Sequence, residues 1–253
     1  MKRIAIITGA SSGMGKRFVQ TLDEYGGFDE VWAVARRREA LETLACPFPV
    51  RSVALDLATA ESIDEFGALL EKEKPQVGLL INAAGYGKFD AVTDIPLGDN
   101  LGMVDLNCRA LTALTQLSVP YMAKGGQIIN IASMAAFQPI PYIAVYGASK
   151  AFVLSYSRAL NRELKDIDVM AVCPFWTKTA FFERAVSENS VVKKYAVMYR
   201  PEDIVSRTWK DAKKRREVSV YGFTAKGQKL LVKLLPRRLV MRVWMKQQGL
   251  KAR

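Results

Sequence analysis

The sequence contains no histidine, the side chain whose charge most readily changes near neutral pH. Ser-His-Asp and Cys-His hydrolases are therefore excluded, and so is zinc held by histidine. The three cysteines, Cys46, Cys108 and Cys173, are far apart and odd in number. They show neither a metal-binding spacing nor a disulfide framework. We interpret them as the reduced thiols of a cytoplasmic protein, and we expect no metal site.

Long hydrophobic runs are also missing. No stretch approaches the ~18 consecutive apolar residues that indicate a membrane-spanning helix. The apolar run near the N-terminus, Ile4 to Ile7, is too short for a signal peptide, and no small-residue cleavage site follows it. The chain has 253 residues, of which 50% are hydrophobic and 25% are charged. This composition is typical of a soluble globular protein, and the length suits a single α/β domain.

Acidic residues are scarce in the last quarter of the chain. From Lys193 to Arg253 there are 18 Lys and Arg but only 4 Asp and Glu, whereas residues 1–192 hold 19 and 21. The net charge of +12 therefore belongs to the C-terminal part and not to the fold as a whole. Such an excess is consistent with nucleic acid, an anionic membrane surface or an acidic ligand, and equally with a solvated face.

Short apolar runs alternate with stretches of helical spacing along most of the chain. We expect strands at residues 3–9, 30–36, 50–57, 77–85, 126–134, 168–174 and 217–223. We expect helices at residues 13–26, 37–45, 58–74, 100–122, 145–165 and 202–214. Continuous apolar strands separated by helices predict the α/β class, with a single doubly wound parallel sheet of about seven strands and helices on both faces.

Ligands of such sheets bind at the carboxyl ends of the strands. The residues at or just past the predicted strand ends are Thr8, Gly9, Arg36, Asp56, Asn82 to Gly85, Ser133 and Pro174. We expect the ligand site among them.

The stretch TGASSGMG joins the first predicted strand to the first predicted helix. Gly9, Gly13 and Gly15 allow a tight turn and a close approach of the backbone to a ligand. The start of the helix offers free N–H groups and the positive end of the helix dipole, which suit a pyrophosphate. The spacing G-x3-G-x-G is weak by itself, but its position between the first strand and the first helix favours a dinucleotide site.

Six motifs occur in order and at suitable distances. They are TGASSGMGK at 8–16, LD at 55–56, NAAG at 82–85, Asn107, Ser133 and YGASK at 146–150. Together they closely resemble the short-chain dehydrogenase/reductase family over roughly residues 1–222. The resemblance implies a Rossmann-type, single-domain NAD(P)-dependent oxidoreductase, commonly a homodimer or homotetramer.

The end of the second predicted strand discriminates between the two cofactors. An acidic residue there would bind the adenosine ribose of NAD and repel the 2′-phosphate of NADP. This sequence has Arg36 where NAD-using members of the family carry Asp, and a guanidinium fork suits a phosphate. We therefore expect NADP(H), with Arg36 and Arg37 toward the phosphate, and interpret Arg38 as a surface residue of the following helix.

The resemblance also implies the other cofactor contacts. Asp56 matches the adenine contact, and the segment from Asn82 to Gly85 matches the lining of the adenosine ribose, with Ala83 in place of a frequent second Asn. The full expected set, besides the two arginines, is Gly9, Ser11, Ser12, Gly13, Met14, Gly15, Asp56, Leu57, Asn82, Ala83, Gly85, Tyr146, Lys150, Pro174, Thr177 and Thr179.

Tyr146 and Lys150 are four residues apart on a predicted helix, so both lie on one face. A free tyrosine has a pKa near ~10 and is a poor proton carrier at neutral pH. A nearby ammonium and the positive ring of an oxidised nicotinamide would lower that pKa. Tyr146 could then give a proton to a carbonyl or take one from an alcohol. By resemblance, Lys150 holds the nicotinamide ribose, Ser133 positions the substrate oxygen, and Asn107 holds a water leading from Lys150.

The sequence departs from the family after the sixth predicted strand. The family usually shows Pro-Gly there, whereas this chain has Pro174 followed by Phe175. The large ring would add an apolar wall beside the hydride site. Further aromatic and apolar residues could complete a substrate lid or, equally, serve as core or oligomer contacts: Trp176, Phe181, Phe182, Tyr195, Met198 and Tyr199. A lid of this kind suits a hydrophobic ketone or alcohol.

The segment 223–253 lies beyond the family core, and we treat it as a basic amphipathic extension packed on the catalytic domain 1–222. Apolar residues recur at helical spacing with Lys and Arg between them, and Pro236 should divide the segment into two short helices. Such a segment is consistent with peripheral contact with an anionic membrane, with closure of the substrate pocket or with packing on a partner subunit.

These patterns predict an NADP(H)-dependent oxidoreductase that acts on the carbonyl or secondary alcohol of a hydrophobic substrate, whether steroid-like, long acyl or aryl. The alternative is a non-catalytic NADP(H)-binding or membrane-associated protein with the same fold. We expect no nucleic-acid partner, because the basic tail lacks a recognisable reader motif.

Overall fold

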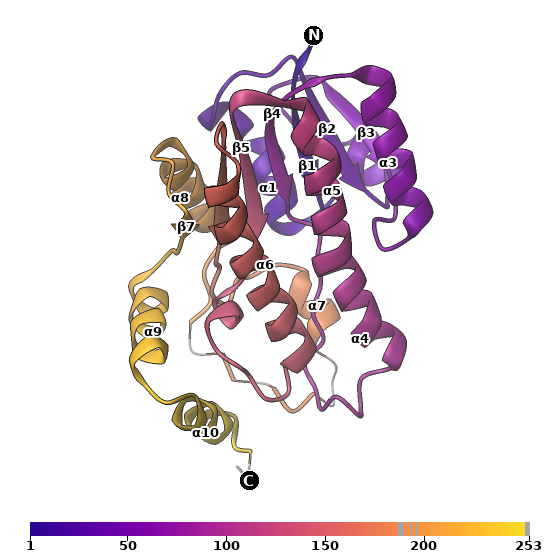
Figure 1. Cartoon of the computed structure of the whole chain (residues 1–253). Coiled ribbons are helices and arrows are strands. Elements are labelled where there is room, and N and C mark those ends of the chain that lie inside the picture. The colour runs from indigo at the N-terminus through magenta and orange to yellow at the C-terminus, as the bar shows by residue number, and fades with distance from the viewer. Residues whose placement is uncertain (187–189, 193, 196, 251–253) are drawn as a thin grey trace.

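The computed structural model describes residues 1–186, 190–192, 194–195 and 197–250 (Figure 1). In these ranges the strands form one parallel sheet in the order β3-β2-β1-β4-β5-β6-β7. The strands are β1 (Arg3–Thr8), β2 (Glu30–Ala35), β3 (Val50–Ala54), β4 (Gln76–Asn82), β5 (Met122–Ile131), β6 (Ile167–Val172) and β7 (Val218–Ser219). The predicted doubly wound sheet is confirmed. The strand order reverses between β1 and β4, which places a crevice at their carboxyl ends.

Helices cover both faces of the sheet, as Figure 1 shows. The helices of the α/β core are α1 (Gly13–Gln20), α2 (Arg38–Glu42), α3 (Ala60–Glu73), α4 (Leu97–Val104), α5 (Leu111–Ser118), α6 (Ala144–Glu163) and α8 (Pro201–Lys213). Three further helices lie toward the carboxyl edge of the sheet: α7 (Phe181–Ala185), α9 (Phe223–Leu234) and α10 (Arg237–Gln248).

The pattern along each strand explains the two layers. Successive side chains of a strand point to opposite faces, and in β1 both sets are apolar. Ile7 packs in a core with Phe18 of α1 and Trp209 of α8. Ile6 packs in a second core, which includes Phe66 of α3. Because both faces are buried, the strand appears in the sequence as a continuous apolar run.

Three predicted elements have different bounds. The long helix expected at 100–122 consists of α4, a π-helical segment Asp105–Ala110 and α5. The helix expected at 13–26 ends at Gln20, where the Thr21 hydroxyl donates to the carbonyl of Arg17 and accepts from the Trp209 indole. The strand expected at 217–223 is only two residues long and pairs with β6 at the edge of the sheet.

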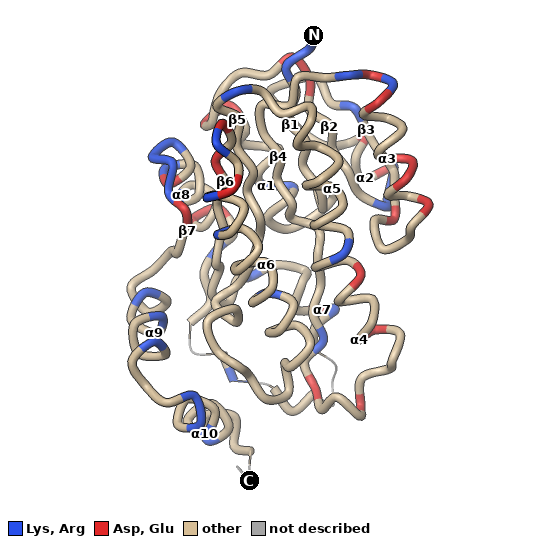
Figure 2. Tube along the Cα trace, in the orientation of Figure 1, with Lys and Arg blue, Asp and Glu red and all other residues tan. Residues whose placement is uncertain are grey.

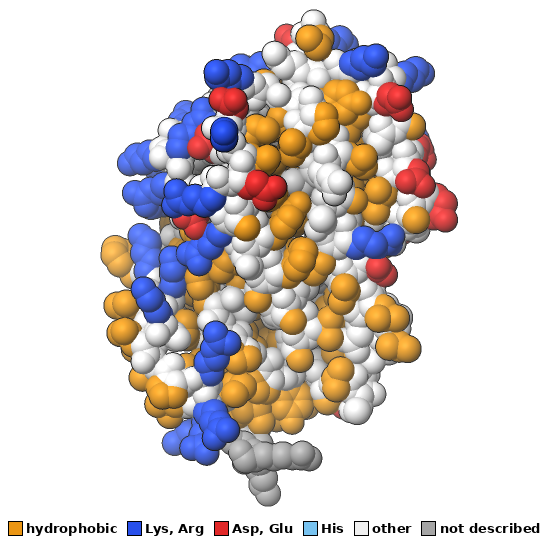
Figure 3. Space-filling view, in the orientation of Figure 1, with side chains coloured by type: hydrophobic (Ala, Val, Ile, Leu, Met, Phe, Trp, Pro, Cys, Tyr) orange, Lys and Arg blue, Asp and Glu red, His pale blue; other side chains and the backbone are white. Residues whose placement is uncertain are grey.

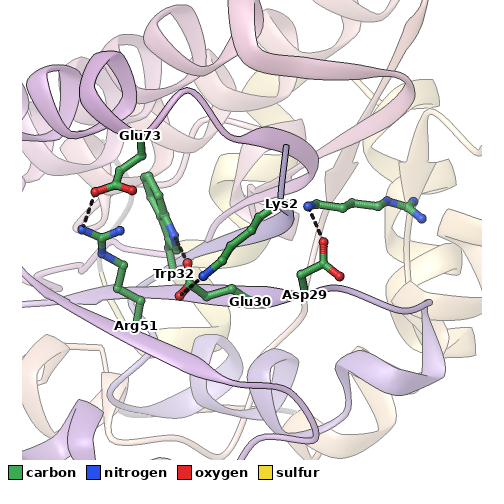
Figure 4. Close-up of polar contacts among 7 residues, drawn as sticks. Lys2, Asp29, Glu30, Trp32, Arg51 and Glu73 are labelled. Carbon is green, nitrogen blue, oxygen red and sulfur yellow. Dashed lines mark hydrogen bonds and ion pairs between the residues drawn. The ribbon is translucent and has the colours of Figure 1, made fainter.

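The amino ends of β1 to β3 carry surface ion pairs and hydrogen bonds (Figure 4). Arg51 lies 3.1 Å from Glu73, and Glu30 lies 3.5 Å from Lys2 while accepting from the Trp32 indole at 2.9 Å. The Arg51 guanidinium lowers the pKa of Glu73. Exposed pairs of this kind contribute little to stability. They lie at the end of the sheet opposite the carboxyl ends of the strands.

A chain of buried amide and hydroxyl groups crosses the sheet. The Asn82 amide of β4 donates to Thr115 of α5 at 3.0 Å and to Asn130 of β5 at 2.9 Å. The Asn130 amide donates in turn to Ser157 of α6 at 3.0 Å, and Ser157 donates to the carbonyl of Val153 at 2.7 Å. These bonds fix the positions of α5 and α6 against β4 and β5, because a buried polar network specifies one arrangement of the elements that it joins.

Pro236 separates α9 from α10, so the predicted division of the extension into two short helices is confirmed. Residues 251–253 lie outside the described part of the chain. Among the residues that the structure describes, no helix has the length and apolar character needed to cross a bilayer. The proposed boundary between a domain at 1–222 and an extension at 223–253 stays a prediction.

The polar chain predicts the effect of one substitution. Asn130→Ala removes the acceptor of Asn82 and the donor to Ser157 and leaves both buried, which should lower the free energy of unfolding by about 1–3 kcal/mol. Urea denaturation would measure it. Thr93→Ala, at an exposed position, is the control and should change little. Equal effects of the two substitutions would contradict a structural role for this chain.

Candidate active site

A cavity of about 1250 Å³ lies at the carboxyl ends of the strands. It collects residues that are dispersed in sequence from the first strand to the C-terminal helices. Eighteen of the predicted site residues line it: Gly9, Ser11, Ser12, Gly13, Met14, Gly15, Arg36, Arg37, Asp56, Leu57, Ala83, Gly85, Ser133, Tyr146, Lys150, Pro174, Thr177 and Thr179. The structure therefore brings these side chains and backbone segments to one place.

The glycine loop lies tightly against the end of β4. Gly9 has a φ of +66°, and a Cβ there would come 2.9 Å from the backbone of Ala83. The Thr8 hydroxyl accepts from the backbone N–H groups of Ala83 and Ala84, both at 3.0 Å. The Ser12 side chain makes no capping hydrogen bond in the described structure, so the first N–H groups of α1 remain available to an anion.

The adenosine end of the cavity carries two arginines and a carboxylate. Arg36 follows β2, and its guanidinium lies 3.9 Å from the Asp56 carboxylate beyond β3. Both side chains are well exposed and line the cavity together with Arg37. A pair this long and exposed holds Arg36 only weakly, so the guanidinium can turn toward a phosphate at small energetic cost.

Asn82 corrects one prediction. The resemblance places Asn82 among the cofactor contacts, but its side chain is buried in the sheet and bonds Thr115 and Asn130. Side chains alternate across a strand, so Asn82 faces the helix layer, and it is the backbone just after it, at Ala83 and Gly85, that reaches the cavity. Asn82 supports the site from within the core.

Tyr146 and Lys150 lie in the first two turns of α6, and both line the cavity. The Lys150 Nζ donates to the carbonyl of Ile131 at 2.8 Å and lies 5.8 Å from the Tyr146 ring centroid. Ser133, just past β5, forms a hydrogen bond with the Tyr146 phenol. Its hydroxyl also accepts from the N–H of Ala135 at 3.1 Å, which fixes its orientation. Hydroxyl, phenol and ammonium thus meet at one wall of the cavity.

The electrostatics of this pair differ from the prediction. Withdrawal from bulk water raises the pKa of Tyr146 to about 12, although the hydrogen bond to Ser133 acts in the opposite direction. Burial also lowers the pKa of Lys150 to about 8. The raised pKa is opposite to the lowering expected for Tyr146, because desolvation is its largest cause, and the effect of an oxidised nicotinamide on this pKa stays a prediction. The phenol is accordingly protonated at neutral pH.

Asn107 lies behind the pair, buried in the π-helical segment between α4 and α5. Its amide donates to the carbonyl of Tyr86 at 2.9 Å and to Ser149 at 3.0 Å, and its oxygen accepts from the N–H of Tyr86 at 3.1 Å. A Cβ on Gly85 would come 2.8 Å from this oxygen and 3.4 Å from the Lys150 Nζ. Asn107 therefore fixes the backbone beside Lys150, and its implied contact with a water stays a prediction.

The loop after β6 runs along the cavity. Pro174 accepts from the N–H of Met134 at 2.9 Å, and the Thr177 hydroxyl donates to the carbonyl of Phe175 at 2.8 Å. Thr179 passes close to the glycine loop, since a Cβ on Gly13 would lie 3.7 Å from it. The segment that follows Pro174 thus closes the cavity over the start of α1.

An aromatic wall surrounds the opposite end of the cavity. Of the predicted lid, five residues line it: Phe175, Trp176, Phe181, Phe182 and Tyr195. Met198 and Tyr199 do not appear in its lining, and Tyr199 instead packs on Tyr221 with ring centroids 5.1 Å apart.

Sequence reasoning missed two members of the wall. Phe89 lies 5.6 Å from Tyr146 and 6.0 Å from Trp176 between ring centroids. Trp244 of α10 stacks on Trp176 at 6.2 Å, and its indole donates to the carbonyl of Pro141 at 3.0 Å. The apolar spacing of the last helix was visible in the sequence, but its contact with Trp176 depends on tertiary packing.

The C-terminal helices form part of the cavity. Lining residues from α9 and α10 are Thr224, Gly227, Gln228, Leu231, Val232, Val240, Val243, Trp244 and Gln247. Of the three arrangements that the sequence left open for this segment, closure of the pocket is therefore present in the structure.

Comparison with known proteins agrees with this geometry. The family profile described as short chain dehydrogenase matches residues 3–190. An uncharacterized oxidoreductase of Staphylococcus epidermidis is 28% identical over 188 residues, which cover 72% of this chain and 81% of that protein. A very-long-chain 3-oxoacyl-CoA reductase of Neurospora crassa is 35% identical over 190 residues, which cover 70% of this chain and 56% of that protein.

A solved structure is similar over nearly the whole length. The short-chain dehydrogenase from Sphingobium yanoikuyae in complex with NADPH has a TM-score of 0.75 and 26% identity, and the alignment covers 94% of this chain and 97% of that one. The chain therefore belongs to the short-chain dehydrogenase family. It is an oxidoreductase whose cofactor is a nicotinamide dinucleotide.

Proposed function

We propose that this protein is an NADPH-dependent reductase of bulky, hydrophobic ketones. The observation that carries the proposal is the position of Tyr146. Its phenol is withdrawn from water, hydrogen-bonded to Ser133 and packed against Phe89 and Phe181 in the wall of the cavity. A protonated acid thus faces an apolar space beside a dinucleotide site, which suits protonation of a carbonyl oxygen.

The residues of the cavity fit the cofactor. The open N–H groups of α1, the two arginines and the Lys150 ammonium are donors, as phosphates and ribose hydroxyls require. The reduced nicotinamide would supply the hydride. Tyr146 gives its proton to the substrate oxygen, and the Ser133 hydroxyl donates a hydrogen bond to that oxygen and orients it. Lys150 holds the ribose and stabilises the phenolate that remains, while Asn107 keeps the backbone around Lys150 in place.

The preference for NADPH over NADH rests on Arg36 and Arg37. Both line the cavity at the end of β2, where an acidic residue would exclude a 2′-phosphate. The similar Sphingobium enzyme was solved with NADPH. The Asp56 carboxylate beside Arg36 is then free to face the adenine.

The size and lining of the cavity support a bulky, apolar substrate. Aromatic rings from three segments of the chain surround the space in front of Tyr146. The similar Neurospora protein is named for a very-long-chain 3-oxoacyl ketone. Steroid-like, long acyl and aryl ketones share the required chemistry. A homodimer or homotetramer and a cytoplasmic location remain part of the proposal.

Removal of the phenolic hydroxyl tests the catalytic role. Tyr146→Phe should lower turnover of a hydrophobic ketone at least about a hundredfold while NADPH binding is retained, because only the proton donor is lost. Tyr156→Phe is the matched control on the same helix, since Tyr156 stacks on Phe152 and does not appear in the cavity lining. Steady-state kinetics and fluorescence titration measure the two quantities. Full activity of Tyr146→Phe would refute the proposal, and NADPH binding by a wild-type protein inactive on every ketone would favour a binding protein.

The arginine at the end of β2 should decide the cofactor. Arg36→Ser should weaken NADPH binding by about tenfold to a hundredfold and leave NADH binding nearly unchanged, because a charged hydrogen bond to the 2′-phosphate is lost. Arg38→Ser, on the first turn of α2, is the control and should alter neither. Isothermal titration of both cofactors measures the effect. An equal loss for NADPH and NADH would show that Arg36 does not discriminate between them.

The pKa values of the pair predict the pH profile. Lys150 loses its charge as the pH rises through about 8, whereas Tyr146 keeps its proton up to about 12. The kcat/KM of ketone reduction should therefore be full below about pH 8 and fall above it, because kcat/KM reports the groups of the free enzyme. Lys150→Arg should shift the fall to higher pH, since the guanidinium stays charged. A kcat/KM independent of pH up to about pH 10 would contradict this.

A further inference from the structure

The outer surface of α9 and α10 is unusually apolar for a surface exposed to water. Phe223, Leu230 and Leu234 are 94%, 60% and 70% exposed, and Leu239 is exposed beside them. Figure 3 shows hydrophobic side chains gathered with basic ones at the lower left of the molecule, where Figure 1 places α9 and α10. We call this surface the C-terminal face. Contiguous apolar patches of this kind mark interaction sites in soluble proteins.

The same two helices carry only positive charge. Seven cations lie on them, and no acidic residue occurs after Glu217: Lys226, Lys229, Lys233, Arg237, Arg238, Arg242 and Lys246. Figure 2 shows blue and no red along α9 and α10. Within the described residues none of the seven cations forms an ion pair. The C-terminal face therefore offers uncompensated charge interleaved with exposed apolar side chains.

This face is attached firmly to the body of the protein. On its inner side Ala225, Val240 and Met245 are buried, and Trp244 both stacks on Trp176 and donates to the carbonyl of Pro141. The helices thus present their outer side chains on a fixed scaffold. The outer apolar side chains do not pack the helices onto the body, so they are available to contact another molecule or a membrane.

The mouth of the cavity lies at this face. Leu231, Leu235 and Val243 line the cavity, and each is also exposed. They therefore connect the exposed apolar surface of α9 and α10 with the apolar interior in front of Tyr146. A hydrophobic molecule held against the C-terminal face would reach the cavity along apolar side chains.

We propose that α9 and α10 dock the protein on an anionic lipid bilayer, with the mouth of the cavity against the lipid. Apolar side chains that project between cations suit the boundary of headgroups and acyl chains. Each Lys or Arg near an anionic surface strengthens binding by roughly fivefold. A further clause, which rests on the proposed function, is that the hydrophobic ketone enters the cavity directly from the bilayer.

Charge selects the bilayer over a second copy of the chain. A twofold dimer through the C-terminal face would bring the same patch of each subunit together and so place cations against cations. Because the face holds no carboxylate, nothing in it would offset that repulsion. Anionic phospholipid supplies the complementary charge and an apolar phase at once.

Vesicle sedimentation tests the docking without any ketone or cofactor. The wild-type protein should bind phosphatidylcholine vesicles that contain about 30% phosphatidylglycerol, should bind pure phosphatidylcholine at least about tenfold more weakly, and should be released by high salt. The triple variant Phe223→Ser, Leu230→Ser, Leu234→Ser should lose at least about tenfold in binding. None of these three residues is in the cavity lining, so reduction of a water-soluble ketone should be unchanged.

Matched controls distinguish binding through the C-terminal face from non-specific binding through exposed leucines or cations elsewhere on the surface. Leu97→Ser with Leu101→Ser removes exposed leucines of α4, and Lys210→Gln with Lys213→Gln and Lys214→Gln removes cations at the C-terminal end of α8 and at its C-cap. Both control variants should bind vesicles as the wild type does. Unchanged binding by the triple variant would overturn the proposal, and so would a soluble dimer that dissociates in the triple variant while no protein binds vesicles.

Reduction of a ketone dissolved in the bilayer tests whether the substrate enters the cavity directly from the membrane. With a hydrophobic ketone dissolved in the anionic vesicles, the wild type should turn over at least about tenfold faster than the triple variant at equal protein concentration. Equal rates, with vesicle binding confirmed, would overturn entry from the bilayer and leave docking standing. Absence of reduction of every ketone would refute the proposed function alone, because the sedimentation result does not depend on it.

Discussion

The withdrawal of Tyr146 and Lys150 from bulk water is the constraint on which the rest of the site depends. Burial raises the pKa of Tyr146, so the phenol keeps its proton at neutral pH. It lowers the pKa of Lys150, so the ammonium loses its proton more readily than a free lysine. Such a pair is expensive to bury unless hydrogen bonds position it. The carbonyl of Ile131 bonds Lys150 and the hydroxyl of Ser133 bonds Tyr146, while Asn107 fixes the neighbouring backbone of Tyr86 and the side chain of Ser149.

The buried polar network of the core extends to the helices that carry the candidate active site. The bonds from Thr115 to Ser157 join α5 and α6 through the sheet, and α6 carries Tyr146 and Lys150 on its first two turns. The π-helical segment before α5 places Asn107 toward Tyr86 and Ser149, as such segments often do at functional sites. In this structure, hydrogen bonds of the scaffold therefore support the helix that carries Tyr146.

The sequence alone sufficed for the sheet, and eighteen of the site residues that it predicts line the cavity. Strand ends of a parallel sheet converge, so residues just past each apolar run, such as Gly9, Arg36 and Ser133, could be assigned to one site. The direction of Asn82 could not be predicted, because it depends on which face of β4 the residue occupies. The pKa of Tyr146 depends on how much water the surrounding rings exclude. The contact of Trp244 with Trp176 depends on how a distant helix packs.

The stack of Trp176 on Trp244 joins two parts of the chain in one wall of the cavity. One ring belongs to the stretch matched by the family profile, which ends at residue 190, and the other belongs to the tail beyond it. The aromatic wall of the cavity is thus shared between the part of the chain that matches the family profile and the C-terminal helices beyond it. Changes in α9 and α10 would therefore reshape the cavity and its outer surface together, without altering Ser133, Tyr146 or Lys150.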